Sequence, residues 1–517
     1  MATVRNATVP NEHADVVISG AGPNGLMLAC ELALAGVQPV VLEQLPEPSL
    51  DPKANGLVGQ VVRLLDMRGL YREFTGLDEP PQPVYEWIFS GMRVPLGGVA
   101  NNPMYALMLP QPKLVRLLDQ RARDLGVQVR WGHEFTDLQS GSDGVAVTVT
   151  APEGVYTLDA AFLVGADGGR SPVRKRVGVD FPGYTSDVVA RLAHVRVPDD
   201  LRGPDGGLDV PGLGPLHFGH NRFDDGTFIY AAFEQDRQMV GTVEYGQQTM
   251  PDDSDPLTLE ELRDSTRRVL GVDLPLLPPE GDGPHALRRM AGMNTRQAER
   301  YRVGNVLLLG DSAHVHSAMG GPGLNLGLQD AVNLGWKLAA TVNGWAPSGL
   351  LDTYQSERYP VGERVMMQSS SQTALMAAGP EVAALRTLFA ELIQIPAAAE
   401  HMANLLAGSD VRYDVGDHHR LAGRLVPDLT LDDGRRVASL LHAGRSVLLD
   451  MSGGDVAGAA QGWAHRVDSV VATITGEPAH GLLLRPDGYV AWAADEFEGA
   501  DRDRLHAALR RWCGISA

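Results

Sequence analysis

The hydrophobic pattern near the start of the chain predicts a β-α-β unit. Residues 14–19 (ADVVIS) are a short apolar, β-branched run typical of a buried strand, and residues 38–42 (QPVVL) are a second one. Between them, the glycine-rich segment 20–25 leads into an apolar helical stretch that stops at Gly36. A strand, a helix and a strand in close succession indicate a parallel, doubly wound sheet.

The middle of the chain has a different pattern. Polar and apolar residues alternate along 188–197, 227–234 and 238–245, which is typical of half-buried antiparallel strands. We therefore expect an antiparallel-sheet domain at 181–285, inserted into a Rossmann-type domain made of residues 1–180 and 286–405. The second part of that domain begins with a strand at 305–309 and continues with a helix from about Leu324 and further long helices at 350–407.

Strand-like runs return in the last part of the chain. The segments RSVLLDM (445–451) and GLLLRPDGYVAWA (481–493) read as strands, and the second is interrupted by a turn at Pro486–Gly488. These runs predict a separate C-terminal α/β domain at 406–517. The predicted fold class is therefore α/β, with an antiparallel-sheet insertion and an additional C-terminal domain.

Composition narrows the function. With 44% hydrophobic and 21% charged residues, the 517-residue chain has material for a core, and a net charge of −20 disfavours nucleic acid and anionic membranes as partners. The two cysteines, Cys30 and Cys513, exclude a disulfide framework and a cysteine-based metal cluster. The first dozen residues lack a signal-peptide pattern and no later run is long enough to span a membrane, so we expect a cytoplasmic protein that binds a small molecule.

The glycine-rich segment predicts a dinucleotide site. Its first glycine allows a tight turn, the second lets a pyrophosphate approach the backbone, and the third allows close packing of helix on strand. The helix N-terminus then presents free N–H groups to the phosphates. An acidic residue follows at the end of the second strand, where it can accept the ribose hydroxyls. The candidate cofactor-binding residues here are Gly20, Gly22, Pro23, Asn24, Gly25, Glu43 and Gln44.

Two further segments indicate FAD as the dinucleotide. Residues 162–176 read FLVGADGGRSPVRKR, and residues 303–325 read VGNVLLLGDSAHVHSAMGGPGLN. With these motifs the chain resembles the single-component FAD-dependent aromatic hydroxylases, the para-hydroxybenzoate hydroxylase group. The resemblance is closest to the branch that acts on aromatic polyketides, and it extends over nearly the whole chain. It implies an FAD-binding first domain, a substrate-binding inserted sheet and a thioredoxin-like C-terminal domain, here without a C-x-x-C motif.

The resemblance also implies roles for individual residues. Asp167 and Gly168 would lie near the FAD pyrophosphate, with Ser171 and Pro172 as N-cap and first residue of a helix. Asp311, after Gly310, would bind a ribityl hydroxyl. Helix N–H groups at the start of the next helix would face the flavin pyrimidine, where they stabilise the anionic reduced form. The further candidate residues are Lys53, Gln111, Gly321, Pro322, Gly323, Leu324 and Asn325.

Some positions depart from the family pattern or invite other interpretations. Lys53 stands where the family usually has an arginine, and Ser317-Ala318 replaces a Pro-Pro beside the substrate. His314 and His316 have no carboxylate or cysteine at ligand spacing, so we interpret them as structural and expect no metal. Four aromatic residues are candidates for either a substrate cavity or ordinary core: Trp87, Phe89, Tyr105 and Phe218.

The function that the resemblance implies is an FAD-dependent monooxygenase. NADPH (or NADH) would reduce FAD, and O2 would form a flavin C4a-hydroperoxide in a dry cavity, which transfers oxygen to a bulky polycyclic aromatic substrate. Because the reactive chemistry belongs to the cofactor, no side chain is assigned as catalytic. Ring hydroxylation in antibiotic biosynthesis is the main hypothesis. Baeyer–Villiger insertion, a non-oxygenating flavin reductase and a flavin-binding protein remain open, as does a homodimer.

Overall fold

In the computed structural model, the described residues are 12–51, 53–203, 206–234, 237–247, 249–251, 256–281, 283, 285–317, 319–474 and 479–517. The chain begins with the predicted β-α-β unit, formed by β1 (Glu12–Ser19), α1 (Pro23–Leu34) and β2 (Val40–Glu43). The apolar residues of both strands are buried, whereas Glu12, His13 and Asp15 of β1 are exposed. Helix α1 ends just before Gly36, whose φ is +81°.

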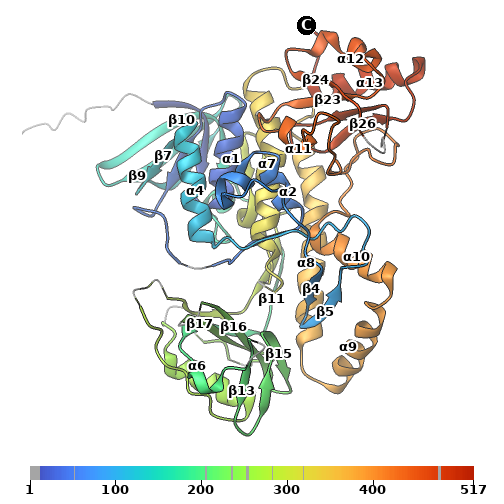
Figure 1. The fold of residues 1–517 in the computed structure, drawn as a ribbon. Coiled ribbons are helices and arrows are strands. Elements are labelled where there is room, and N and C mark those ends of the chain that lie inside the picture. Colours follow the sequence, from blue (N-terminus) through green and yellow to red (C-terminus); the bar gives the residue numbers. More distant parts are fainter. Residues whose placement is uncertain are drawn as a thin grey trace, which may run out of the picture.

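This unit lies in the main sheet of the molecule. The strand order is β20 (Arg302–Val303), β21 (Val306–Leu308), β10 (Gly154–Gly165), β1, β2 and β7 (Gln128–Trp131). All strands from β21 to β7 run parallel, whereas β20 is antiparallel. A hairpin of β8 (Glu134–Ser140) and β9 (Val145–Ala151) extends β10 away from this sheet (Figure 1).

Helix α1 packs against α4 (Gln111–Asp124) and α7 (Pro322–Val342). The contact with α7 is close because of two glycines of α7. A Cβ on Gly327 would lie 2.2 Å from the Asn24 side chain, and one on Gly335 would lie 2.4 Å from the Glu31 side chain. Small residues at these positions therefore let α7, whose first turn belongs to the candidate site, lie directly on α1.

The second sheet is antiparallel and forms a separate body, green in Figure 1. Its order is β15 (Gly219–Phe223), β16 (Gly226–Glu234), β17 (Arg237–Glu244), β12 (Val189–Val195) and β18 (Leu287–Ala291), with α6 (Leu259–Leu270) packed on it. Strand β18 lies beyond the boundary predicted at residue 285. Its sequence, LRRMA, lacks a clear alternation, and only its pairing with β12 makes it part of the sheet.

Several short elements connect the two sheets. Strands β11 (Gly183–Thr185), β19 (Asn294–Gln297) and β22 (His314–Val315) form a three-stranded sheet, and β3 (Leu57–Val58) pairs with β6 (Ala106–Leu107). Three short helices lie near the main sheet: α2 (Gln60–Asp66), α3 (Leu70–Thr75) and α5 (Pro172–Arg176). The hairpin of β13 (Leu208–Val210) and β14 (Gly214–Leu216) belongs to the body of the second sheet, where it shares a core cluster with β12, β16 and α6 (Figure 1).

The predicted long helices follow α7. They are α8 (Thr353–Met376), α9 (Pro380–Leu392) and α10 (Pro396–Ala407), and the hairpin β4 (Glu86–Phe89) and β5 (Met92–Pro95) lies beside them (Figure 1). Within the described part of the chain, no single helix combines the length and apolar composition needed to cross a membrane. Only α9 and α10 taken together meet that test, with a bend of 104° between them.

The C-terminal unit contains a four-stranded sheet. Its order is β24 (Val467–Val471), β23 (Ser446–Asp450), β25 (Gly481–Leu484) and β26 (Val490–Ala494), with only the β23–β24 pair parallel. Its helices are α11 (Val437–Leu440), α12 (Asp455–Ala459) and α13 (Gly499–Cys513). The unit packs against α7 and α8 through a buried ionic and aromatic cluster centred on Arg485.

Candidate functional site

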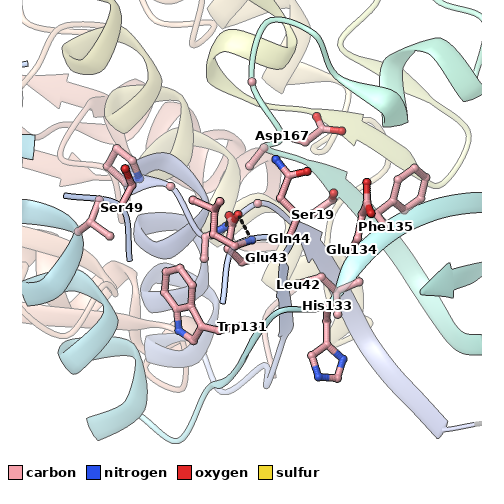
Figure 2. A pocket seen from close by; sticks show the side chains of 18 of the residues that line it. Ser19, Leu42, Glu43, Gln44, Ser49, Trp131, His133, Glu134, Phe135 and Asp167 are labelled. Atoms are coloured by element: carbon pink, nitrogen blue, oxygen red, sulfur yellow. Dashed lines mark hydrogen bonds between the residues drawn. The ribbon is translucent and has the colours of Figure 1, made fainter. Parts of the chain in front are cut away.

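A cleft of about 280 Å³ opens at the carboxyl ends of the parallel strands. Edges of this kind, where the strand order reverses, bind ligands in open α/β sheets. Figure 2 shows Glu43 between Asp167 and Trp131 in this cleft. The structure brings nine predicted site residues together in its lining: Gly20, Gly22, Pro23, Glu43, Gln44, Lys53, Gln111, Asp167 and Gly168.

The three glycines of the loop meet three different requirements. A Cβ on Gly20, whose φ is +110°, would lie 2.4 Å from the Ala166 carbonyl oxygen. A Cβ on Gly25 would lie 2.0 Å from the Gly20 carbonyl oxygen, so both residues must be glycine for the backbone to close. Gly22 differs, because a Cβ there would meet nothing within 4 Å. Its missing side chain leaves open space at the N-cap of α1, where a phosphate can approach.

Glu43 holds the glycine-rich loop after β1 as well as lining the cleft. One carboxylate oxygen accepts the Ala21 N–H at 2.9 Å and the other accepts the Leu45 N–H at 3.0 Å. Each carboxylate oxygen has two lone pairs, so both retain capacity for a ligand hydroxyl. The geometry is compatible with the predicted contact to a ribose, and it also ties the end of β2 to the turn after β1.

Asp167 is engaged mainly with the protein. Its Oδ1 accepts the Ser312 hydroxyl at 2.8 Å, and its Oδ2 accepts the Val173 N–H at 3.0 Å. Ser312 Oγ in turn accepts the Gly168 N–H at 3.0 Å. The predicted N-cap is confirmed, since the Ser171 hydroxyl accepts the Arg174 N–H at 2.9 Å at the start of α5. Asp167 therefore fixes the loop that follows β10 relative to the turn that follows β21, while its side chain also lines the cleft.

Sequence reasoning missed Trp131, which ends β7 opposite Glu43 and lines the cleft. Its indole Nε1 is buried and has no hydrogen-bond partner in the described part of the chain. An unpaired buried donor of this kind is costly unless a ligand satisfies it, and an adenine ring offers acceptor nitrogens. The open space at Gly22 and this orphaned N–H both fit the adenosine diphosphate part of FAD. A single tryptophan at a strand end has no signature that sequence analysis could use.

The other predicted site residues lie outside the cleft. Asn24 packs between Gly310 and Gly327, and Gly25 contacts Gly20. Gly310 and Asp311 open a short turn after β21, and Asp311 is exposed there. This turn contacts α7, whose N-cap is Gly321, with φ +65°, and whose first turn contains Pro322, Gly323, Leu324 and Asn325.

Asn325 holds the first turn of α7 in place. Its side chain accepts the Val58 N–H of β3 at 3.0 Å and donates to the Gly321 carbonyl at 3.2 Å. Pro322 carries no N–H, so Gly323 and Leu324 are the next residues that can present backbone donors at this helix end. These donors are the ones available to the flavin pyrimidine predicted from the sequence.

A second cleft, of about 590 Å³, lies between the nucleotide domain and the second sheet. Its lining comes from residues 169–181, from β18 and β19, and from the segment that follows the Gly310-Asp311 turn. None of the described residues that line it is a carboxylate, although the chain as a whole carries a net charge of −20. We call it the cationic cleft, after its five basic residues: Arg170, Arg174, Lys175, Arg289 and Arg296.

The remaining sequence hypotheses have mixed outcomes. Phe89 is buried and stacks on Phe389, and Trp87 packs in the same core cluster, so the core interpretation applies to both. Tyr105 packs against the main core and Phe218 is 43% exposed.

His314 Nε2 lies 2.6 Å from Asp330 Oδ2, whereas His316 bonds a carbonyl oxygen. The two histidines therefore have separate protein partners. Ala318 lies outside the described residues.

The fold and the first cleft define a dinucleotide-binding α/β protein. Comparison with protein families matches residues 13–369 to the FAD binding domain and residues 419–516 to the C-terminal region of aromatic-ring hydroxylases. The chain therefore belongs to the FAD-dependent aromatic hydroxylases, which confirms the resemblance seen in its motifs, and it is an FAD-dependent monooxygenase.

Individual relatives cover nearly the whole chain. The 12-dehydrotetracycline 5-monooxygenase/anhydrotetracycline 6-monooxygenase of Streptomyces rimosus is 42% identical, over 97% of this chain and 99% of that protein. The solved structure of the anhydrotetracycline hydroxylase OxyS from Streptomyces rimosus has a TM-score of 0.86 and 40% identity, over 98% of this chain and 100% of that one. The dialkyldecalin synthase of Streptomyces rugosporus is 36% identical, over 97% and 99%.

Replacing Asp311 with alanine is expected to weaken FAD binding. Asp311 is exposed in the turn that contacts α7, and loss of a charged acceptor for a cofactor hydroxyl costs about 1.5–3 kcal/mol, a tenfold to hundredfold rise in Kd. Titration of the apoprotein with FAD measures this. Asp311→Asn, which keeps one acceptor oxygen, is the control and is expected to bind FAD more tightly than Asp311→Ala. Equal FAD affinity in Asp311→Ala and the wild type would contradict the assignment.

Proposed function

We propose that this protein inserts one oxygen atom from O2 into a bulky polycyclic aromatic substrate of the polyketide type, by ring hydroxylation, with NADPH as electron donor. The observation that carries the proposal is the 42% identity, over almost the entire chain, to an anhydrotetracycline monooxygenase. The cleft geometry supports it independently, because the open N-cap at Gly22 and the unpaired Trp131 N–H fit FAD.

When bound, FAD supplies the redox and oxygen chemistry, and the protein supplies positioning. The residues of the first cleft would hold the adenosine and pyrophosphate. The first turn of α7, fixed by Asn325, would present backbone N–H groups to the pyrimidine edge and stabilise negative charge there. The hydrogen bonds of Ser312 with Asp167 and Gly168 would hold the loop after β10 and the turn after β21 in a fixed relative position around the bound FAD.

The second sheet supports an apolar substrate. A small hydrophobic cluster lies on it around Val188, Ala190 and Val243, with partly buried Met290 and Met293 packed against it. The Ser317 hydroxyl donates to Met293 Sδ at 3.2 Å, so this cluster reaches the segment that leads to α7. The three core residues are themselves buried, so a planar aromatic substrate would contact Met290 and Met293, which also line the cationic cleft, away from water as the reaction requires.

The cationic cleft supports NADPH as the electron donor. Arg289 is ion-paired with Glu261, but the other four basic residues and the lack of a carboxylate among the described lining residues favour a ligand with several negative charges. The 2′-phosphate of NADPH adds charge that NADH lacks. Arg174 is already oriented by the Ser312 and Gly169 carbonyl oxygens and by stacking on Phe181, with 3.7 Å from guanidinium to ring centroid. Arg170 and Lys175 are exposed and available to phosphate.

The C-terminal unit supports a thioredoxin-like assignment through its strand order, with one parallel and two antiparallel pairs. It has no C-x-x-C motif, so we propose a packing role. The domain boundaries, a homodimer and a cytoplasmic location stay predictions.

The test is a coupled assay of purified holoprotein with NADPH and a panel of polycyclic phenols, quinones and naphthacene-type polyketides. Stimulated NADPH oxidation with equimolar O2 uptake and a product heavier by one oxygen supports the proposal. Fragmentation separates a ring hydroxyl from a Baeyer–Villiger ester. Because one relative is named a dialkyldecalin synthase, substrate conversion without O2 uptake is monitored as well, and it would contradict the proposed oxygen insertion.

A further inference from the structure

The segment between the Gly310-Asp311 turn and α7 contains a histidine whose position the proposed function does not explain. His316 follows β22 and lines the cationic cleft together with Val315 and Met293. On its other side, Cε1 and Nε2 of the ring lie 3.3 Å from the position of a Cβ built on Gly323. The imidazole therefore forms the wall between the cationic cleft and the first turn of α7.

The hydrogen bonding of His316 fixes its tautomer. Nδ1 lies 2.9 Å from the Ser317 carbonyl oxygen, which can only accept, so Nδ1 carries the hydrogen and donates it. Burial lowers the pKa of His316 and the neighbouring His314 acts in the same direction, whereas the hydrogen bond to Ser317 and the charge of Asp311 act against it; the net lowering favours the neutral ring. Nε2 consequently holds a lone pair, and it has no hydrogen bond from any residue that the structure describes.

A neutral side-chain acceptor is rare in this place: among the described lining residues the other one is Asn294, whose Oδ1 already accepts from Thr185 and Arg296. All other titratable side chains that line the cationic cleft are permanent or near-permanent cations, which can only donate. They suit phosphate oxygens and cannot bind an N–H group. His316 Nε2 lies 3.3 Å from a Cβ built on Gly323, against the first turn of α7, where the flavin pyrimidine is expected. A ligand that places phosphates on the arginines and an amide N–H near α7 would use both kinds of group.

We propose that His316 is a positioning residue for the electron donor: its Nε2 accepts a hydrogen bond from the carboxamide N–H of the dihydronicotinamide and orients that ring toward the flavin. The assignment rests on the proposed function, because it assumes that NADPH enters the cationic cleft. The phosphates hold the molecule through the basic residues, while His316 sets the orientation of its reactive end. Binding strength and orientation are thus assigned to different residues.

The experiment compares two electron donors on the FAD-loaded enzyme under anaerobic conditions. One is NADPH, and the other is its 3-acetylpyridine analogue. In the analogue a methyl ketone replaces the carboxamide, so this substituent of the ring has no N–H. Flavin reduction is followed by stopped flow for the wild type, His316→Phe, which keeps a ring but has no acceptor, and His316→Gln, which keeps an acceptor. Lys175→Gln is the control for phosphate binding.

The expected results separate orientation from binding. With NADPH, His316→Phe lowers the limiting reduction rate roughly tenfold, the value of one lost hydrogen bond, and leaves the apparent Kd within threefold. With the analogue, the wild type and His316→Phe are reduced at equal limiting rates, whereas His316→Gln retains part of the preference for NADPH. Lys175→Gln raises the apparent Kd and leaves the limiting rate unchanged.

Two readouts other than turnover exclude a purely structural role. FAD content and melting temperature of His316→Phe are expected to match the wild type; if that variant loses FAD, His316→Leu replaces it in the comparison. If the wild type and His316→Phe show the same ratio of reduction rates with NADPH and with the analogue, the proposal is overturned. A wild-type enzyme that no nicotinamide donor reduces contradicts the proposed function instead, so the two failures are distinguishable.

Discussion

Replacing Gly22 with valine is expected to give a folded but colourless protein. The backbone at Gly22 has φ −69° and ψ 174°, which any residue can adopt, and a Cβ there meets nothing within 4 Å. The isopropyl group therefore fits the protein but occupies the space where a pyrophosphate approaches the N-terminus of α1. We expect the affinity for FAD to fall by at least about a hundredfold, or ~2.7 kcal/mol. Visible absorbance and FAD titration measure the loss.

Two other glycines provide matched controls for this variant. Gly97 is exposed and also has open space around its Cβ position, so Gly97→Val is expected to remain folded and yellow. Gly25→Val places a Cβ 2.0 Å from the Gly20 carbonyl oxygen and is expected to prevent folding of the first domain. If Gly22→Val binds FAD as tightly as the wild type, the pyrophosphate does not lie against this residue.

The second large effect is expected at Arg485, which joins the C-terminal unit to α8. Arg485 is fully buried and donates to Glu357 Oε1 at 2.6 Å and to both carboxylate oxygens of Asp487. Its guanidinium also lies 4.7 Å from the ring centre of Trp512 and 5.3 Å from that of Trp336. Arg485→Met leaves two buried carboxylates, of which Glu357 keeps the Lys337 ammonium at 2.7 Å. We expect the free energy of unfolding to fall by about 3–5 kcal/mol.

The acid dependence of stability reports on the same cluster. Burial alone would raise the pKa of Glu357, but the charges of Arg485 and Lys337 outweigh it and lower the pKa from 4.5 to about 2. A depressed carboxylate pKa stabilises the folded state fully above pH 4.5, and that contribution is lost as the pH falls from 4.5 toward 2. Urea unfolding across this range is expected to show the loss in the wild type and a smaller one in Arg485→Met.

A surface arginine serves as the control. Arg435 pairs with Asp433, and both side chains are about half exposed, so Arg435→Met is expected to change stability by less than about 0.5 kcal/mol. An Arg485→Met protein as stable as Arg435→Met would mean that the buried network contributes no net stability and that apolar packing alone holds the C-terminal unit.

Local features of the sequence predicted much of the fold. The β-branched runs became β1, β2 and β21, and Ser171-Pro172 became the N-cap and first residue of α5. These features depend on interactions within a few residues, which the sequence displays directly. The hydrophobic pattern did not predict β18 as a strand of the second sheet. Its place there is decided by pairing with β12, which lies about a hundred residues earlier in the chain.

The sequence by itself determined the dinucleotide loop, since the spacing of Gly20, Gly22 and Gly25 and the acid at Glu43 satisfy requirements of local backbone geometry. Only the tertiary structure decided what surrounds it. Asp167 lines the cleft, and the sequence did not indicate that its carboxylate is hydrogen-bonded to Ser312, 145 positions away. Trp131 and the cationic cleft likewise come from segments far apart in the chain. Charge and hydrogen-bond complementarity between such segments depends on how the sheets pack, and no local pattern encodes it.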